Sequence, residues 1–535
     1  MSAVAPPVIW SIAGTDSGGG AGLAADQRAA EAFGVHLCPV VAAVTAQHSR
    51  AVTRVMPVGT DMLDAQLQAL ADDLPPRAVK TGLLGSAEQV KLVARWIDRL
   101  RQAGPVALVV DPVLGASSGA AFADAATLQA YRDELLPRAS VVTPNRHEAA
   151  ALLDYAHLAD DCDPDDLPSL PALARRLRAL GAEAVCITGG DSADLDGRVL
   201  DWLDSPHATG WLAAPRIATV HHHGTGCTYA TGMAAAMALG FVAAEAAVLA
   251  KMATAHALRH GHAAGGGAGP VKARPGFATD PTLLPLLSWG ERPLFAAPPA
   301  EAAAVARSLG LYALVDSAER AQQVLAAGIR TLQLRIKTPP QPDAAWHAAL
   351  RAAVLGCVQA CRAAGAELFV NDHWQLAAEL GAGGAHLGQE DLLALGDDGR
   401  AALAASGLAL GISTHSLWEL CRARSLAPRY IACGPVWPTL TKAMPWRPQG
   451  LHNLRWWQHM AGAPVVAIGG LLLADQVRQA AACGVAGVCL VRGLGDDPKL
   501  TVPGYQQAYN AGLAQAGAAG MPPLPTLPHS GLAPG

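Results

Sequence analysis

Short apolar runs and helical stretches alternate along the first half of the chain. The runs cover residues 8–14, 37–45, 78–84, 106–110, 140–143 and 184–188, and stretches rich in Ala and Leu separate them. This alternation predicts an α/β domain whose mostly parallel sheet is covered by helices on both faces. In such sheets ligands bind beyond the carboxyl ends of the strands, so the polar residues that end these runs are the first candidates for chemistry.

The second half repeats one pattern along its length. Strand-like runs occur at residues 311–316, 331–337, 367–372, 385–389, 408–413, 430–436, 465–470 and 487–492, with helical segments between them. Eight such units predict a (β/α)8 TIM barrel, near the lower size limit of about 200 residues for that fold.

A segment rich in Gly and Pro, residues 261–300, separates the two patterns. Another stretch without periodicity closes the chain, and stretches of this kind are typical of linkers and unfolded tails. We therefore expect a first domain over residues 1–290, a linker over 291–307, the barrel over 308–516 and a disordered tail over 517–535.

Composition narrows the function classes. The chain has 535 residues, of which 51% are hydrophobic and 16% charged, and this excludes a disordered protein. Its net charge is −5, whereas nucleic-acid-binding proteins usually carry an excess of basic residues. The ten cysteines contain no C-x-x-C pair and no Lys or Arg precedes Arg28, so we expect a cytoplasmic protein without a signal peptide. The uncharged stretch 227–244 is mostly Ala, which predicts a buried helix rather than a membrane span.

Polar residues gather at the predicted ends of the barrel strands, which meet at one face of such a barrel. Asp372 and Asp391 follow different strands and suit Mg²⁺, which prefers one or two carboxylates plus phosphate oxygens. The backbone of Gly469 and Gly470, after the seventh strand, suits a phosphate. These residues imply a metal-bridged pyrophosphate and a monophosphate at one site.

Six strings in this half resemble thiamine-phosphate synthase: QLRIK (333–337), FVNDHW (369–374), HLGQEDL (386–392), GISTH (411–415), GPVWPTLTK (434–442) and AIGG (467–470). The resemblance implies that Asp372 and Asp391 bind Mg²⁺. It implies that a pyrimidine diphosphate is bound by Gln333, Arg335, Lys337, Asn371, Ser413 and Lys442, the last of which neutralises the departing pyrophosphate. It implies that a thiazole phosphate is bound by Thr439, Leu440, Thr441, Gly469, Gly470, Val491 and Arg492. Arg492 stands where the family often has Ser, and a guanidinium can bind phosphate bidentately.

The first half carries two glycine-rich segments. Residues 20–25 fit G-x-G-x-x-A, but no acid follows the second predicted strand where a dinucleotide ribose would need one, and no P-loop is present. The stronger signal is Gly224, Thr225 and Gly226 before an Ala-rich stretch, where backbone N–H groups and the helix dipole can hold a transferring phosphoryl group. Asn145 and Glu148 are candidates for holding Mg²⁺ through water, and Thr188 and Gly189 for contacting a nucleotide.

Six strings here resemble the hydroxymethylpyrimidine/phosphomethylpyrimidine kinase of the ribokinase superfamily: AGTDSGGGAG (13–22), VTAQHSR (44–50), KTGLLG (80–85), VVDPV (109–113), TPNRHEA (143–149) and HGTGCT (223–228). The resemblance implies a ribokinase-like fold in which Gln47 and Asp26 contact an aminopyrimidine between apolar walls made by Leu83 and Val113. Cys227 stands where sugar kinases of the superfamily use an Asp base.

The role of Cys227 has two interpretations. A helix amino terminus lowers a thiol pKa, so Cys227 can act as a base or can line the pocket for the alcohol. Thr188 stands where the family commonly has Lys, and Asp191 where it has His. The neighbouring His221, His222 and His223 are expected to be solvated or packed in a loop rather than to bind a metal.

By these resemblances, the product of the first half would be a substrate of the second half. The first would use ATP to phosphorylate 4-amino-5-hydroxymethyl-2-methylpyrimidine and then its monophosphate; the second would couple the diphosphate to thiazole phosphate. Two alternatives remain open at this point: a vitamin B6 kinase fused to a barrel, and a thiamine-precursor sensor without turnover. The expected partners are these small molecules and ATP, with no nucleic acid and no membrane, and a homo-oligomer is possible.

Overall fold

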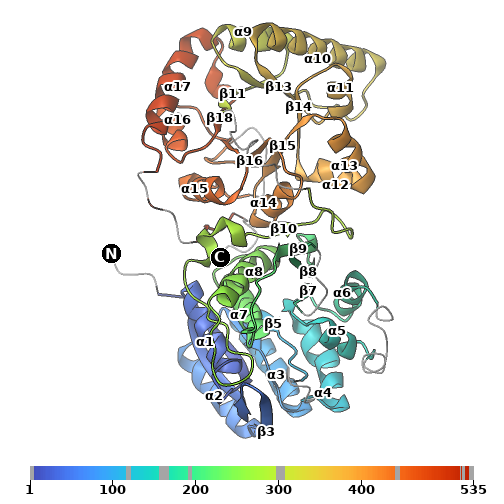
Figure 1. The fold of residues 1–535 in the computed structure, drawn as a ribbon, viewed down its shortest axis with the longest axis vertical. Helices are drawn as coiled ribbons and strands as arrows, with labels where there is room; N and C mark the ends of the chain where they lie inside the picture. The colour runs from blue at the N-terminus through green and yellow to red at the C-terminus, as the bar shows by residue number, and fades with distance from the viewer. Residues whose placement is uncertain are drawn as a thin grey trace. The chain divides into compact units, whose positions relative to one another are not determined.

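The computed structural model describes residues 5–115, 122–155, 168–190, 196–296, 308–439, 446–517, 520 and 524–528. Apart from the last four residues, the chain divides into two compact units, Met1–Pro293 and Leu294–Gly531. Each unit contains one sheet (Figure 1).

The first unit is built on a ten-stranded sheet in the order β10-β9-β8-β7-β6-β5-β4-β1-β2-β3. Its strands are β1 (Val8–Gly14), β2 (His36–His48), β3 (Ala51–Pro57), β4 (Ala78–Thr81), β5 (Ala107–Val110), β6 (Val141–Val142), β7 (Val185–Ile187), β8 (Arg198–Asp204), β9 (Thr209–Pro215) and β10 (Leu286–Leu287). Six neighbouring strands of this sheet pair in parallel, as the sequence predicts: β2, β1, β4, β5, β6 and β7. Both edges are extended by antiparallel strands that the apolar runs do not reveal: β3 on one side, and β8, β9 and β10 on the other.

Helices cover this sheet. They are α1 (Gly22–Phe33), α2 (Thr60–Asp73), α3 (Ala87–Ala103), α4 (Ala125–Ala130), α5 (Arg146–Leu152), α6 (Leu170–Ala179), α7 (Thr225–Ala238) and α8 (Ala243–Arg259). The consecutive residues Ile9, Trp10, Ser11 and Ile12 of β1 are all buried. Because successive side chains of a strand face opposite sides, both faces of the sheet are covered.

The uncharged stretch 227–244 lies mostly in α7 and reaches the start of α8. Ala234, Ala235 and Ala236 of α7 have no exposed surface, so this stretch is part of the interior of the unit. Among the described residues, none of the helices combines the length and the apolar character needed to cross a bilayer.

The second unit is a closed barrel of parallel strands, β11 to β18, in sequence order (Figure 1). The strands are β11 (Gly310–Val315), β12 (Thr331–Leu334), β13 (Glu367–Asn371), β14 (Gly384–Leu387), β15 (Ala409–Thr414), β16 (Tyr430–Cys433), β17 (Val465–Ala467) and β18 (Gly487–Leu490). The helices around them are α9 (Ala318–Ala326), α10 (Ala344–Ala364), α11 (Trp374–Glu379), α12 (Gln389–Ala394), α13 (Gly396–Ala405), α14 (Leu417–Arg424), α15 (Gly450–Met460), α16 (Ala474–Ala481) and α17 (Pro498–Leu513). The predicted (β/α)8 barrel is confirmed.

Aromatic side chains fill the barrel interior. Tyr430 makes edge-to-face contacts with Phe369, at a centroid distance of 5.0 Å, and with Tyr312, at 5.6 Å. Glycines on the neighbouring strands make room for these rings: a Cβ at Gly384 would lie 2.5 Å from the Phe369 ring, and one at Gly411 would lie 2.3 Å from the Tyr430 ring. The packing therefore depends on a pairing of large and small residues across adjacent strands.

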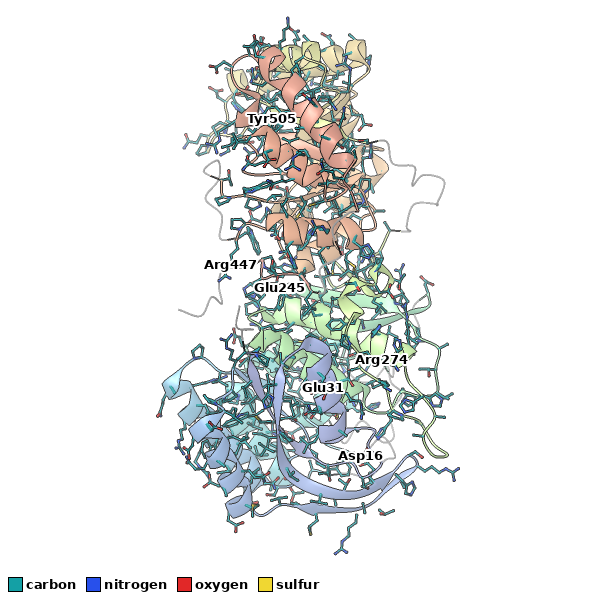
Figure 2. All side chains as sticks on the ribbon, turned by 90° about the vertical axis from the view of Figure 1, so that its left-hand side faces the viewer. Asp16, Glu31, Glu245, Arg274, Arg447 and Tyr505 are labelled. Atoms are coloured by element: carbon teal, nitrogen blue, oxygen red, sulfur yellow. The ribbon has the colours of Figure 1, made fainter. Side chains whose placement is uncertain are left out.

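The segments at the ends of the predicted domains make specific contacts. Glu291, in the expected linker, pairs with Arg175 of the first unit at 2.5 Å, and its carbonyl accepts a hydrogen bond from the Trp211 indole. In the expected disordered tail, Thr526 donates its backbone N–H to the Asn453 side chain of α15 at 2.7 Å. Arg447, labelled in Figure 2, donates its N–H to the carbonyl of Pro528. Asn453 and His452 of α15 also donate hydrogen bonds to the carbonyls of Thr526 and Leu524, so residues 524–528 contact this helix.

Candidate active sites

Asp372 and Asp391 come from neighbouring βα units of the barrel. Asp372 follows β13 with a left-handed φ of +65° and donates its N–H to the carbonyl of His386 at 3.1 Å. Asp391 lies in the first turn of α12, where its Oδ2 accepts a hydrogen bond from the N–H of Gly388 at 3.1 Å. Both residues are exposed, so a ligand can reach them.

The surroundings of Asp372 disfavour its negative charge. Desolvation of the carboxyl group and the negative charge of Asp391 raise the pKa of Asp372, while His373 and Arg335 act in the opposite direction. Two carboxylates that repel each other at a strand-end face suit a divalent cation. Among the described residues, no cluster of three or more His, Cys, Asp or Glu side chains could hold a metal. Two accessible carboxylates are a donor set that Mg²⁺ can use, since this ion takes its remaining ligands from phosphate and water.

The other expected ligands of the pyrimidine diphosphate surround the same strand ends. Asn371 is 8% exposed, Arg335 is half-buried and Lys337 is exposed. Gln333 is 3% exposed and donates to the Tyr312 hydroxyl at 3.2 Å, so its amide group belongs to the buried interior in this structure. Ser413, near the end of β15, is half-buried.

A chain of hydrogen bonds runs through the barrel interior to Ser413. The Tyr312 and Tyr430 hydroxyls are 2.6 Å apart, and the Tyr430 hydroxyl lies 2.8 Å from Nδ1 of His386. Nε2 of His386 lies 2.8 Å from Oγ of Ser413. Burial lowers the pKa of His386 to about 4, and the positive charges of Arg335 and His415 contribute, so the imidazole is neutral at neutral pH. Sequence reasoning missed His386, Tyr312 and Tyr430, although HLGQEDL begins with that histidine.

The glycines after β17 form a tight turn against the loop that follows β16. Gly469 and Gly470 both have left-handed φ values, +94° and +74°. A Cβ on Gly470 would lie 2.5 Å from Cβ of Trp437, so only glycine fits this approach. The half-buried Thr439 belongs to the loop after β16, and Leu440, Thr441 and Lys442 lie outside the described residues. After β18, Val491 is half-buried and Arg492 is exposed.

Gly224, Thr225, Gly226 and Cys227 form the start of α7 and the residue before it, and we call them the anion cradle. It begins at Gly224. Its φ is +86°, and a Cβ there would lie 2.2 Å from the carbonyl oxygen of Gly20. Among the described residues, none accepts a hydrogen bond from the backbone N–H of Gly226 or Cys227, whereas the N–H of Thr225 bonds to His222. These two free donors and the dipole of α7 can hold an anionic group.

Asp16, labelled in Figure 2, connects this cradle to the glycine-rich segment after β1. Its carboxylate accepts hydrogen bonds from the N–H groups of Gly20 at 2.9 Å and Ala21 at 2.8 Å. Nε2 of His223 lies 3.1 Å from Oδ2 of Asp16 and 3.3 Å from Nε2 of Gln47. His223 is packed in the loop, as expected, and it joins the cradle to Asp16 and to Gln47.

The same contacts set the charge of Asp16. Burial alone would raise the pKa of Asp16, but hydrogen bonds from His223 and from the backbone of Ala21 and Gly18 lower it to about 2. Asp16 is therefore a carboxylate throughout the neutral pH range. Sequence reasoning missed it because only the fold brings residues 16 and 223 together.

Asp26 belongs to a buried group of polar and charged side chains. Its side chain is fully buried, with Oδ2 2.6 Å from the Ser11 hydroxyl and Oδ1 2.8 Å from the Thr231 hydroxyl. The ammonium group of Lys80 lies 3.2 Å from Asp26 and 3.3 Å from Asp111. These partners satisfy both carboxylate oxygens, and the expected contact of Asp26 with an aminopyrimidine stays a prediction.

The buried charges also act on Cys227. Although the residue keeps some exposed surface, burial of its thiol raises its pKa to about 12. Lys80 opposes this rise, while Asp26 and Asp111 add to it. Desolvation and the two nearby carboxylates both disfavour the thiolate, which is the opposite of the effect expected from the helix amino terminus. The structure favours a protonated thiol that lines the pocket.

The expected nucleotide contacts have structural partners. Asn145 and Glu148 form a capping box at the start of α5, with bonds of 2.8 and 2.9 Å between each side chain and the other's backbone N–H. Thr188 pairs with Asn145 in an isolated β-bridge. Gly189 donates its N–H to the buried Asp201 at 3.0 Å, so this donor is not available to a nucleotide. Asp191 lies outside the described residues.

The expected apolar walls lie beyond β4 and β5. Leu83 is 7% exposed and Val113 is half-buried. Leu83 also lines a cavity of about 350 Å³, together with Val55 and Phe122.

Comparisons with known proteins give the same division of the chain. Residues 16–272 match the phosphomethylpyrimidine kinase family, and residues 311–494 match the thiamine monophosphate synthase family. The chloroplastic thiamine biosynthetic bifunctional enzyme of Arabidopsis thaliana is 32% identical over 506 residues, covering 92% of this chain and 90% of the relative.

Single-function relatives match each half. The hydroxymethylpyrimidine/phosphomethylpyrimidine kinase of Synechococcus elongatus is 41% identical over 268 residues, which are 50% of this chain and 97% of the relative. The thiamine-phosphate synthase of Neisseria meningitidis is 43% identical over 205 residues, which are 38% of this chain and 95% of the relative.

Proposed function

The chain belongs to the thiamine biosynthetic bifunctional enzymes, and we propose which of its residues carry each of the two reactions. The first unit uses ATP to phosphorylate 4-amino-5-hydroxymethyl-2-methylpyrimidine and then its monophosphate. The second unit couples the resulting diphosphate to thiazole phosphate and releases thiamine phosphate and pyrophosphate.

In the first unit, the transferred phosphoryl group lies at the start of α7. The free N–H groups of Gly226 and Cys227 stabilise its negative charge, and phosphoryl transfer needs little else from the protein beyond positioning. Gln47, held by His223, contacts the pyrimidine, with Leu83 and Val113 as apolar walls. On the nucleotide side we propose Thr188, with Asn145 and Glu148 supporting a water-bound Mg²⁺.

In the barrel, Arg335, Lys337, Asn371 and Ser413 bind the pyrimidine diphosphate. Asp372 and Asp391 hold Mg²⁺, which would supply positive charge to the departing pyrophosphate. Lys442 adds a second positive charge there. The thiazole phosphate is bound by Thr439, Leu440, Thr441, Gly469, Gly470, Val491 and Arg492.

The observation that carries the barrel assignment is the placement of Asp372 and Asp391, two exposed carboxylates that follow the neighbouring strands β13 and β14. Repulsion between two accessible carboxylates costs free energy in the absence of a cation, and a diphosphate–metal complex removes that cost. The same face presents Arg335 and Lys337, whose charges match the remaining diphosphate oxygens.

Two variants, one in each unit, test whether each unit carries its reaction independently of the other. Gly226→Asp places a carboxylate in the anion cradle, and a Cβ at this position meets no atom within 4 Å, so Gly226→Ala is a matched steric control. We expect Gly226→Asp to abolish ATP-dependent diphosphate synthesis while coupling of supplied diphosphate continues. Asp372→Asn should do the reverse. Loss of both activities in either folded variant would contradict independent sites.

A substrate comparison tests the specificity. Phosphorylation of the aminopyrimidine alcohol and of pyridoxal is measured with the same protein and ATP concentration. We expect the aminopyrimidine to have the higher kcat/KM; a preference for pyridoxal would overturn the proposal.

The cysteines support a proposal for the compartment in which the enzyme works. All nine cysteines that the structure describes are free, which fits our proposal that the enzyme works in a reducing compartment such as the cytoplasm.

A further inference from the structure

We propose that Tyr430 and His386 position the hydroxyl of Ser413 so that its proton is directed away from the imidazole and toward the pyrimidine diphosphate. This inference rests on the proposed role of Ser413 in binding that substrate. Tyr430 and His386 are positioning residues here, since they act through Ser413 and not on the reacting atoms.

The direction of the hydrogen-bond chain begins at Gln333. Its Nε2 can only donate, so the Tyr312 oxygen accepts this bond of 3.2 Å. The Tyr312 proton then needs an acceptor of its own. Among the described residues, the oxygen of Tyr430, 2.6 Å away, is the acceptor within reach. Tyr312 therefore donates to Tyr430.

The same reasoning fixes the next two bonds. Tyr430 accepts from Tyr312 and donates its own proton to Nδ1 of His386, at 2.8 Å. A neutral imidazole carries one proton, so an accepting Nδ1 requires the proton to be on Nε2. Nε2 then donates to Oγ of Ser413, also at 2.8 Å. The four side chains before Ser413 in this chain are each at most 6% exposed, so water does not compete with these bonds; they are Gln333, Tyr312, Tyr430 and His386.

Ser413 is left with a free proton. Its oxygen already accepts from His386, so the remaining O–H has to donate elsewhere. Its main chain is held separately, because Gln389 Nε2 donates to the Ser413 carbonyl at 3.0 Å. A half-buried serine with a fixed main chain and a directed proton suits an acceptor on the ligand, such as a diphosphate oxygen or a pyrimidine nitrogen.

A tautomer measurement tests the chain without catalysis. The ¹⁵N shifts of His386 in the full-length protein distinguish the Nε2–H form from the Nδ1–H form, and loss of the signal in His386→Gln identifies it. We expect the Nε2–H form in the unsubstituted protein and a shift toward Nδ1–H in Tyr430→Phe. Tyr312→Phe is the matched control: it also removes one buried hydroxyl, but Tyr430 can still donate to His386. An Nδ1–H form in the unsubstituted protein would overturn the proposal.

A double-mutant cycle tests the consequence for coupling. We expect Tyr430→Phe and Ser413→Ala each to lower kcat/KM for the diphosphate by about 10- to 100-fold, the range for one hydrogen bond to a charged group. The double variant should be no worse than Ser413→Ala alone, because Tyr430 acts through Ser413. Tyr312→Phe should stay close to the unsubstituted protein. Additive losses in the double variant would contradict the proposal.

Two further results separate folding and substrate assignment from the inference. If Tyr430→Phe does not fold, His386→Gln and His386→Leu replace it: the Gln amide can donate to Ser413, so it should retain more coupling than Leu, and equal losses would count against the proposal. If Ser413→Ala leaves kcat/KM unchanged, the proposed substrate contact of Ser413 fails, while the tautomer measurement still decides whether the hydrogen-bond chain runs as inferred.

Discussion

The ammonium group of Lys80 lies 3.2 Å from the carboxylate of Asp26, and neither side chain has any exposed surface. Asp111 lies on the other side of the ammonium group, at 3.3 Å. Burial alone would lower the pKa of Lys80, but the two carboxylates raise it above its usual value. Lys80 lies in β4, Asp111 directly follows β5 and Asp26 lies in α1.

Removing the cation of this cluster should destabilise the first unit. Lys80→Met leaves two buried carboxylates without a positive partner, and we expect a loss of about 3–5 kcal/mol in the free energy of unfolding. Urea unfolding of the full chain, followed by the transition of this unit, measures it. Lys91→Met on the exposed face of α3 is the control and should change little. Equal stability of the two variants would show that the ion pair is not needed.

Cys227 should react slowly with alkylating reagents. Its thiol pKa of about 12 leaves little thiolate at pH 8, so we expect iodoacetamide to modify it at least about tenfold more slowly in the folded protein than in the same protein unfolded in urea. Peptide mass spectrometry over time gives both rates. Rapid modification in the folded state would indicate an activated thiolate and revive the interpretation as a base.

The pH dependence of barrel stability should carry the signature of His386. Its pKa is about 4 when folded and 6.5 in the unfolded reference, so the unfolded state binds the proton more tightly. Stability is therefore lost as the pH falls from 6.5 toward 4, by roughly 3 kcal/mol over the full interval. His386→Gln should flatten this dependence in urea unfolding between pH 7 and pH 5. His347→Gln, at an exposed position of α10, should leave the slope unchanged.

Asp372→Asn should separate stability from function. The folded state raises the pKa of Asp372, so its charge costs stability above the unfolded pKa, and the cost disappears as the pH falls below it. The neutral amide removes this cost, and Asn tolerates the φ of +65°. We expect the metal-free variant to melt at an equal or higher temperature than the unsubstituted protein at pH 7.

The metal dependence of melting completes this test. Mg²⁺ with pyrophosphate should raise the melting temperature of the unsubstituted barrel and have little effect on Asp372→Asn. Equal stabilisation of both proteins would show that Asp372 does not hold the ion. A variant that melts at lower temperature than the unsubstituted protein would contradict the charge repulsion.

Local pattern predicted much of the fold. The barrel strands are short and mostly apolar, with polar interruptions such as Gln333 in β12 and His386 in β14. The repeat of eight was nevertheless visible in the sequence, and the strand ends placed Asp372 and Asp391 on one face. The antiparallel strands β3, β8 and β9 were not among the predicted strands. β3 lies at one edge of the sheet, whereas β8 and β9 lie between β7 and the edge strand β10. The spacing of Asn145 and Glu148 has two explanations. The sequence suggested a site that holds Mg²⁺ through water, and in the structure the same two residues form the capping box at the start of α5.

The sequence by itself determined the order of the elements and the residues that each strand end presents, because these follow from positions that are adjacent along the chain. The tertiary structure alone decided that Lys80 lies between Asp26 and Asp111, that the Cys227 thiol stays protonated, and that Tyr430 connects Tyr312 to His386. Ionisation and the direction of a hydrogen bond depend on what is buried next to a group, and burial is set by residues that are far apart along the chain.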